Sequence, residues 1–299
     1  MFPNKRSFFM IIRVGILLVF GICQPGQIFG ESAITPAAQI LNQLLSPNEA
    51  ERFKVIEEAK KRHKEISFEN IRTALKSSTQ KNVSTLIFVL IETGRDDIYR
   101  LNLSERQTIE KAEGSFPNIA YYYARVNPEK GIEELFRLYD QYSEQMMFVC
   151  KAIGEVGTPK ANNFLLNQAI SLKKSGKSIY SQLAGLSITR QTIKAEQIGW
   201  FLEQKLDREE IIKLARLKTD FDWKQIVSFY HAGKKKRFFA TEYILGEPDR
   251  YFEALRDIVD YELKQGNRDS VLQIMMSDSI RNCPSERVRE YRKSVLPKS

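Results

Sequence analysis

The stretch Ala152–Ala161 (AIGEVGTPKA), followed by Asn162–Leu166 (NNFLL), decides the fold, because it marks the end of one helix, a tight turn and the start of a second helix. Gly157 suits the left-handed backbone conformation with which helices commonly end. Thr158 can accept a hydrogen bond from the free amides of the next helix, and Pro159 fits its first position, where no amide hydrogen is needed. The alanine at the end of the first stretch is small enough to let two helices approach closely. The stretch therefore predicts two helices joined by a short turn.

Apolar residues recur at helical spacing along most of the chain after residue 46. The pattern i, i+3, i+4, i+7 is typical of an amphipathic helix, and it is followed by Ile132, Leu135, Phe136 and Tyr139, and again by Met146, Val149, Cys150 and Ile153. Helix starts led by proline are predicted at Pro128, Pro159 and Pro248, and the first two are 31 residues apart. No alternating pattern of useful length predicts a strand. The sequence therefore predicts an all-α protein.

The turn around Gly157 carries the pattern A-x-G-x-x-G-x-x-x-A and resembles a HEAT-like repeat, most clearly over residues 144–172. The tyrosine-rich pair of helices over Ile119–Tyr142 also resembles a tetratricopeptide repeat, so the repeat type outside 144–172 stays open. Either resemblance implies an α-solenoid of stacked helical hairpins, in the HEAT case an armadillo-type superhelix, and we expect one such domain over residues 31–299. Repeats of this kind are binding scaffolds far more often than enzymes.

Residues 1–30 have the layout of a signal peptide. Lys5, Arg6 and Arg13 precede the apolar run Val14–Ile22, and Ile28-Phe29-Gly30 offers a small residue for cleavage before Glu31. Nine apolar residues are too few to span a bilayer, which needs about 20. The segment predicts export, to the periplasm or outside the cell. Two alternatives stay open, a lipoprotein lipidated at Cys23 and an uncleaved anchor, and contact with a membrane is expected only in these two cases.

The net charge of the chain is +9, and removal of residues 1–30 takes away three basic residues and leaves +6. This charge is moderate, and an exported protein meets little nucleic acid, so no nucleic-acid partner is expected. After cleavage the remaining cysteines are Cys150 and Cys283, whereas a secreted domain built on disulfides would carry many more.

The sequence has none of the motifs that hold metals or cofactors. It lacks HExxH, paired CxxC, GxSxG and a glycine-rich phosphate loop after a strand. We therefore expect no metal, no cofactor and no catalytic residue. Two alternatives belong to other classes. An all-α envelope enzyme acting on glycan needs just two well-placed carboxylates, for which acidic pairs such as Glu133-Glu134 are plentiful. A lipid-anchored lipoprotein with a structural helical body is the other.

Two groups of residues are candidates for binding a partner. Tyr121, Tyr122 and Tyr123 could line a groove, because tyrosine is part apolar and part polar and suits interfaces. The run Lys234, Lys235, Lys236 and Arg237 follows Gly233, which closes a predicted helix over Trp223–Ala232. These cations either complement the carbonyls at the end of that helix or contact an anionic partner. Together these features predict an exported, non-enzymatic helical-repeat scaffold that binds protein partners in the cell envelope.

Overall fold

The computed structural model describes residues 36–77, 80–112 and 114–296. Within these ranges the chain folds into α-helices without any strand, and a single isolated bridge joins Ile193 to Thr219. The prediction of an all-α protein is confirmed. The signal peptide predicted over residues 1–30 lies outside the described residues.

The helices are short and follow one another through brief turns. In chain order they are α2 (Pro36–Leu44), α3 (Glu49–Lys61), α4 (Phe68–Ser77), α5 (Gln80–Thr93), α6 (Asp97–Arg100), α7 (Leu103–Glu110), α8 (Phe116–Arg125), α9 (Pro128–Gln141), α10 (Met146–Val156), α11 (Pro159–Lys174), α12 (Tyr180–Thr189), α13 (Ala195–Glu203), α14 (Arg208–Ala215), α15 (Trp223–His231), α16 (Lys234–Gly246), α17 (Phe252–Lys264), α18 (Arg268–Met275), α19 (Asp278–Arg281) and α20 (Glu286–Val295).

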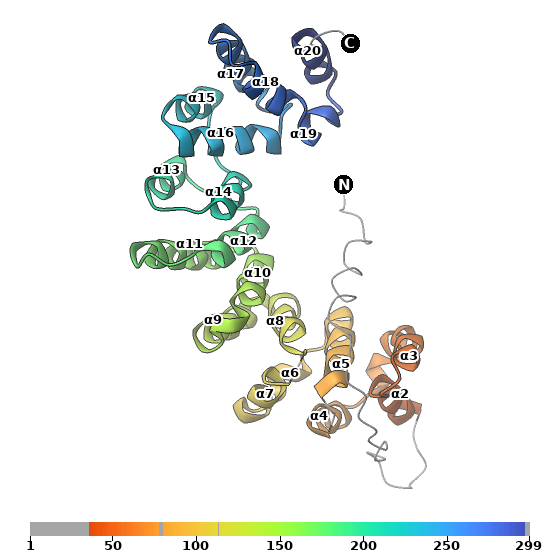
Figure 1. Cartoon of the computed structure of the whole chain (residues 1–299). Helices are drawn as coiled ribbons and strands as arrows, with labels where there is room; N and C mark the ends of the chain where they lie inside the picture. Colours follow the sequence, from red (N-terminus) through yellow and green to blue (C-terminus); the bar gives the residue numbers. More distant parts are fainter. Residues whose placement is uncertain (1–35, 78–79, 113, 297–299) are drawn as a thin grey trace.

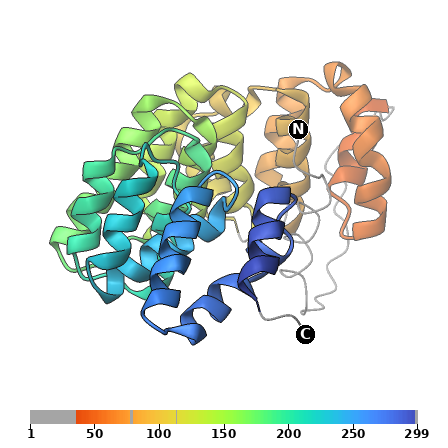
Figure 2. The same cartoon turned by 90° about the horizontal axis from the view of Figure 1, so that it is seen from above.

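The helices are arranged in chain order along a curved path that runs from α2 and α3 to α20 (Figure 1). The helices α9, α11 and α13 lie on the outer side of the curve, and α8, α10, α12 and α14 lie on the inner side. Neighbouring inner helices pack on each other, α8 on α10, α10 on α12, α12 on α14 and α14 on α16. Seen from above, most helices stand side by side with roughly aligned axes (Figure 2). Contacts are therefore made mainly between elements that are close in sequence.

The turn between α10 and α11 has the predicted construction. Gly157 follows α10 with a φ of 67°, in the left-handed region. The side chain of Thr158 accepts a hydrogen bond from the Ala161 amide (3.3 Å), and Pro159 is the first residue of α11. The third predicted proline-led start is wrong, because α17 begins at Phe252 rather than at Pro248.

Two glycines let α10 and α12 approach until their backbones touch. A Cβ atom added to Gly154 would lie 2.3 Å from the carbonyl oxygen of Gly185, and one added to Gly185 would lie 2.3 Å from the carbonyl oxygen of Cys150. Real Cβ atoms do not come this close to a carbonyl oxygen. The contact between these two inner helices therefore requires glycine at both positions.

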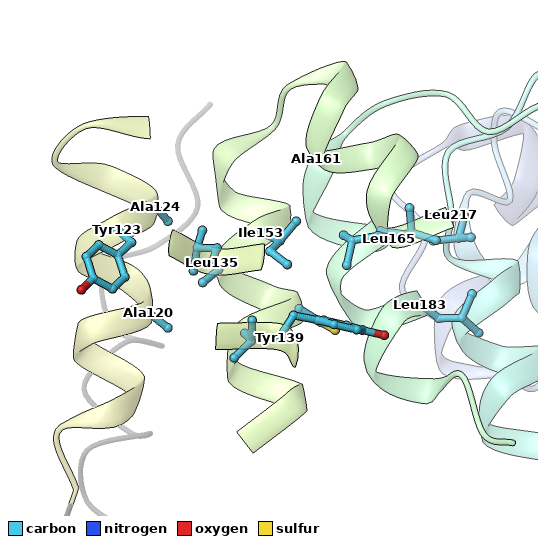
Figure 3. Packing of buried hydrophobic residues seen from close by; sticks show 14 of the residues in the cluster. Ala120, Tyr123, Ala124, Leu135, Tyr139, Ile153, Ala161, Leu165, Leu183 and Leu217 are labelled. Carbon is cyan, nitrogen blue, oxygen red and sulfur yellow. The ribbon is translucent and has the colours of Figure 1, made fainter. Parts of the chain in front are cut away.

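A continuous apolar core runs through the whole row of helices, from Ala37 to Val288. Between α8 and α12 its side chains come from every helix (Figure 3), including Ala120, Leu135, Ile153, Leu165 and Leu183. Tyr139 of α9 reaches toward α12, where Gln182 donates a hydrogen bond to its hydroxyl (2.8 Å). Each helix thus buries its apolar face against the neighbours before and after it.

Candidate interaction surface

The three consecutive tyrosines of α8 divide between the core and the surface. Tyr122 and Tyr123 are fully buried, so their predicted contact with a partner is wrong. The Tyr122 hydroxyl donates to the Arg95 carbonyl oxygen (2.9 Å) and accepts from the Ile98 amide (3.2 Å). The Tyr123 hydroxyl donates to Glu110 Oε1 (3.1 Å). Burial raises the pKa of both phenols well above the usual value.

Tyr121 is the one of the three tyrosines that keeps part of its ring at the surface. The guanidinium of Arg125 lies over this ring, 5.3 Å from its centre. Arg125 also pairs with Glu155 of α10 (3.1 Å), so the group spans two inner helices. Tyr121 therefore remains a candidate for partner contact.

The four cations Lys234, Lys235, Lys236 and Arg237 form the first turn of α16. Arg237 complements the end of the preceding helix, as one interpretation expects, because its Nε donates to the Tyr230 carbonyl oxygen in the last turn of α15 (3.3 Å). Cations at a helix N-terminus oppose the helix dipole, which favours negative charge there. The preference of helix N-termini for acidic residues therefore does not explain why four basic residues lie here.

Three of these four cations contact neighbouring helices. Lys235 donates to the Gln204 carbonyl oxygen (2.8 Å), and Lys236 pairs with Glu203 (2.5 Å). The hydrogen bond from Lys236 lowers the pKa of Glu203. The guanidinium of Arg237 lies 4.9 Å from the centre of the Tyr230 ring. Lys234, by contrast, is exposed.

The structure brings further cations beside this cluster, which the sequence reasoning missed. The loops α11–α12, α13–α14 and α15–α16 meet along one edge of the helix row, because alternate helices run back to that edge. Lys173 donates to the Lys205 carbonyl oxygen (2.9 Å), which joins the first loop to the second, and Lys235 joins the third to the second. We call this surface the basic edge, and its basic residues are Lys173, Lys174, Lys177, Lys205, Arg208, Lys234, Lys235, Lys236 and Arg237.

A buried carboxylate lies at the base of the basic edge. Glu210 of α14 accepts hydrogen bonds from Lys173 (2.7 Å), the Ile179 amide (2.8 Å) and the Ser178 hydroxyl (3.1 Å). Burial alone would raise the pKa of Glu210, but the hydrogen bonds from Lys173 and from backbone amides outweigh it, so the pKa lies below the usual value. This joint fixes the α11–α12 loop on α14.

The basic edge exposes more positive than negative charge. Lys174, Lys177, Lys205, Arg208 and Lys234 are exposed. Four acidic residues lie in the same segments, and three of them are already engaged: Glu203 by Lys236, Glu210 by Lys173, and Asp207 as the N-cap of α14; the fourth is Glu209. The remaining field of this edge is positive and suits an anionic partner.

The opposite edge of the row is joined by backbone and amide groups instead. The Gln191 side chain donates to the Gly157 carbonyl oxygen (2.9 Å), and the Ile193 amide donates to the Lys218 carbonyl oxygen (2.8 Å). The Ala195 amide donates to Asp220 Oδ1 (2.9 Å). Lysine ammonium groups thus join the loops at the basic edge, whereas main-chain groups paired with each other or with the Gln191 and Asp220 side chains join them here.

Glu110 of α7 and Glu134 of α9 are a carboxylate pair beside aromatic rings, the arrangement that a glycan-cleaving enzyme would need. Arg137 pairs with both carboxylates, and the hydroxyls of Tyr123 (3.1 Å) and Tyr142 (3.4 Å) donate to Glu110. The Glu110 side chain has no exposed surface (0%). These contacts make the pair a structural joint between α7, α8 and α9.

Over the described ranges, no set of three or more histidine, cysteine or acidic residues is placed to bind a metal ion. No helix in the same ranges is both long and apolar enough to cross a bilayer. No model of a known protein family matches this chain, and no curated protein or solved structure matches it either.

Proposed function

We propose that this chain is an exported, non-enzymatic α-solenoid scaffold that binds protein partners in the cell envelope. The observation that carries the proposal is the basic edge, a surface assembled from three loops that are distant in sequence and meet through helix stacking. A row of stacked helix pairs offers an extended surface on which many weak contacts can add up.

The use of the buried carboxylates supports a binding role rather than a chemical one. Glu110 joins α7, α8 and α9, and Glu210 joins α11, α12 and α14. Glu262 of α17 accepts a hydrogen bond from Tyr230 of α15 (2.9 Å). In each case a buried carboxyl group connects neighbouring helices, which suits a scaffold whose curvature must be fixed.

The proposal predicts a specific, stoichiometric protein partner. The full chain would be expressed in its native host with a C-terminal tag, cross-linked in the intact envelope and purified, with an unrelated exported helical protein treated identically. Recovery of a protein in about equal amounts with the chain, and not with the unrelated protein, supports the scaffold. Recovery of nothing above that background, or turnover of an envelope glycan by the purified chain, contradicts it.

A further inference from the structure

We infer that the basic edge binds an extended acidic segment of a partner protein, laid across the three loops so that successive carboxylates meet successive loops. This inference rests on the proposed function and specifies the chemistry of the contact. It starts from exposed lysines at each of the three loops: Lys177 in the first, Lys205 in the second, and Lys234 directly after the third, at the start of α16.

The loops are fixed relative to one another. Lys173 and Lys235 both donate to carbonyl oxygens of the middle loop, at 2.9 and 2.8 Å. Lys173 is itself almost fully buried, with 7% of its side chain exposed, and pairs with the buried Glu210. The exposed cations beside these contacts are therefore presented from a rigid base rather than from mobile loops.

The spacing of the loops matches an extended chain. The inner helices that follow the three loops, α12, α14 and α16, pack directly on one another. Packed helices lie about 8–10 Å apart, and an extended chain in the polyproline II conformation advances about 3.1 Å per residue with three residues per turn. Carboxylates placed every third residue along such a segment would therefore lie on one face, about 9 Å apart, and meet one loop each.

The local chemistry also favours a carboxylate at the third loop. Gly233 precedes α16 with a φ of 111° and has no side chain to accept from the first amides of that helix. The N-terminus of a helix attracts negative charge, yet this turn carries four cations. A carboxylate from a partner would satisfy both the amides and the lysines.

The composition of the edge argues against an apolar contact and against fixed bidentate recognition. None of the exposed large apolar side chains of the described residues lies in these three loops. Seven of the nine cations are lysines, and the two arginines lie over the rings of Phe238 and Tyr230. Lysine acts as a hydrated point charge, so the contact should be sensitive to salt and tolerant of sequence between the acids.

The test compares two variants of equal charge. The edge variant carries Lys177→Gln, Lys205→Gln and Lys234→Gln, one change in or directly beside each loop. The control variant carries Lys194→Gln, Lys218→Gln and Lys224→Gln, three exposed lysines at the opposite edge. Neither set includes a lysine that pairs with a carboxylate of the chain, so both variants should keep the fold, and circular dichroism and thermal unfolding would check this.

The probe is a fluorescent peptide with glutamate at every third position and serine or glycine between, compared with a peptide of the same composition whose glutamates are clustered. Fluorescence anisotropy at low salt would measure both. Loss of the three exposed pairs should weaken binding of the spaced peptide about tenfold in the edge variant. The control variant should bind it nearly as the native chain does. The clustered peptide should bind more weakly throughout.

Four results would overturn the inference. One is the absence of saturable binding below about 1 mM peptide. Another is an equal loss in both variants, which would mean attraction by net charge alone. The third result concerns vesicles that contain phosphatidylserine. If these vesicles bind the native chain and bind the edge variant about tenfold more weakly, while the peptide binds neither, the edge recognises a lipid surface. A partner captured from the envelope equally by the native chain and the edge variant would leave the scaffold standing and reject only this edge.

Discussion

Gly154→Ala adds one methyl group at the contact between α10 and α12, and we expect it to destabilise the protein. The new Cβ would lie 2.3 Å from the Gly185 carbonyl oxygen and 3.1 Å from Ile188 Cβ. Because the first neighbour is backbone, relief requires the two helices to separate. Overpacking of this kind costs about 1–3 kcal/mol. Alanine would gain about 1 kcal/mol over glycine from helix propensity alone, so the measured loss should be somewhat smaller than the packing cost.

The matched control is Gly199→Ala in α13. Gly199 lies inside a helix, and a Cβ added there would meet nothing within 4 Å. The same substitution should therefore stabilise the protein by about 0.5–1 kcal/mol. Urea unfolding followed by circular dichroism would measure both variants. In thermal unfolding, a change of 1 kcal/mol corresponds to about 2–4 °C for a chain of this size.

The two variants should change the free energy of unfolding in opposite directions if α10 and α12 approach closely. If Gly154→Ala is as stable as Gly199→Ala, the two backbones do not touch and the close approach is refuted. The double variant Gly154→Ala/Gly185→Ala should lose less than the sum of its single changes, because the first methyl group already separates the helices.

Three further outcomes are expected. Glu110→Ala should destabilise the protein by about 3 kcal/mol in urea unfolding, because it leaves the guanidinium of Arg137 without its buried partner, whereas the exposed Glu133→Ala should change little. The hydrogen bond from Lys76, together with Arg72, lowers the pKa of Glu105 from 4.5 to about 2. The stabilising contribution of Glu105 is therefore complete above pH 4.5 and is lost as the pH falls toward 2. Glu105→Gln should flatten the dependence of unfolding free energy on pH in that window, and an unchanged slope would contradict this. The mature chain should begin at Glu31 on N-terminal sequencing, and a lipidated Cys23 or an intact Met1 would reject that cleavage site.

The turn from α10 to α11 could be predicted because helix caps act over a few residues. The effect of each turn residue depends only on its immediate neighbours: Gly157 ends α10, Thr158 caps α11 and Pro159 starts it. Proline is less decisive alone: Pro248 lies in a turn, and the helix after it begins four residues later. Local chemistry thus predicts helix ends where several signals agree.

Which side chains of α8 are buried could not be predicted in the same way. Three tyrosines in a row point to almost every side of a helix, and the sequence does not say which sides other helices will cover. Tyr122 is covered where its hydroxyl meets Arg95 and Ile98 at the start of α6, and Tyr123 where its hydroxyl meets Glu110 of α7. The burial of a residue inside a helix therefore depended on tertiary contacts.

The basic edge joins residues from 173 to 237, and only the stacking of helix pairs brings them together. One sequence signal points toward it. Residues 156–195 contain six basic residues and no acidic one. Gly233 marks the end of α15, as predicted, but the first turn of the next helix has neither a capping side chain nor an acidic residue that would predict its start at Lys234.

Both edges of the row are braced, but by different groups. At the opposite edge, the bridge between Ile193 and Thr219 fixes the distance between neighbouring loops. At the basic edge, Lys173 does the same, because its ammonium group lies between the buried Glu210 and the Lys205 carbonyl oxygen. Bracing on both sides fixes the angle between neighbouring helices, so an acidic segment would meet the three loops at a spacing that is set before it binds.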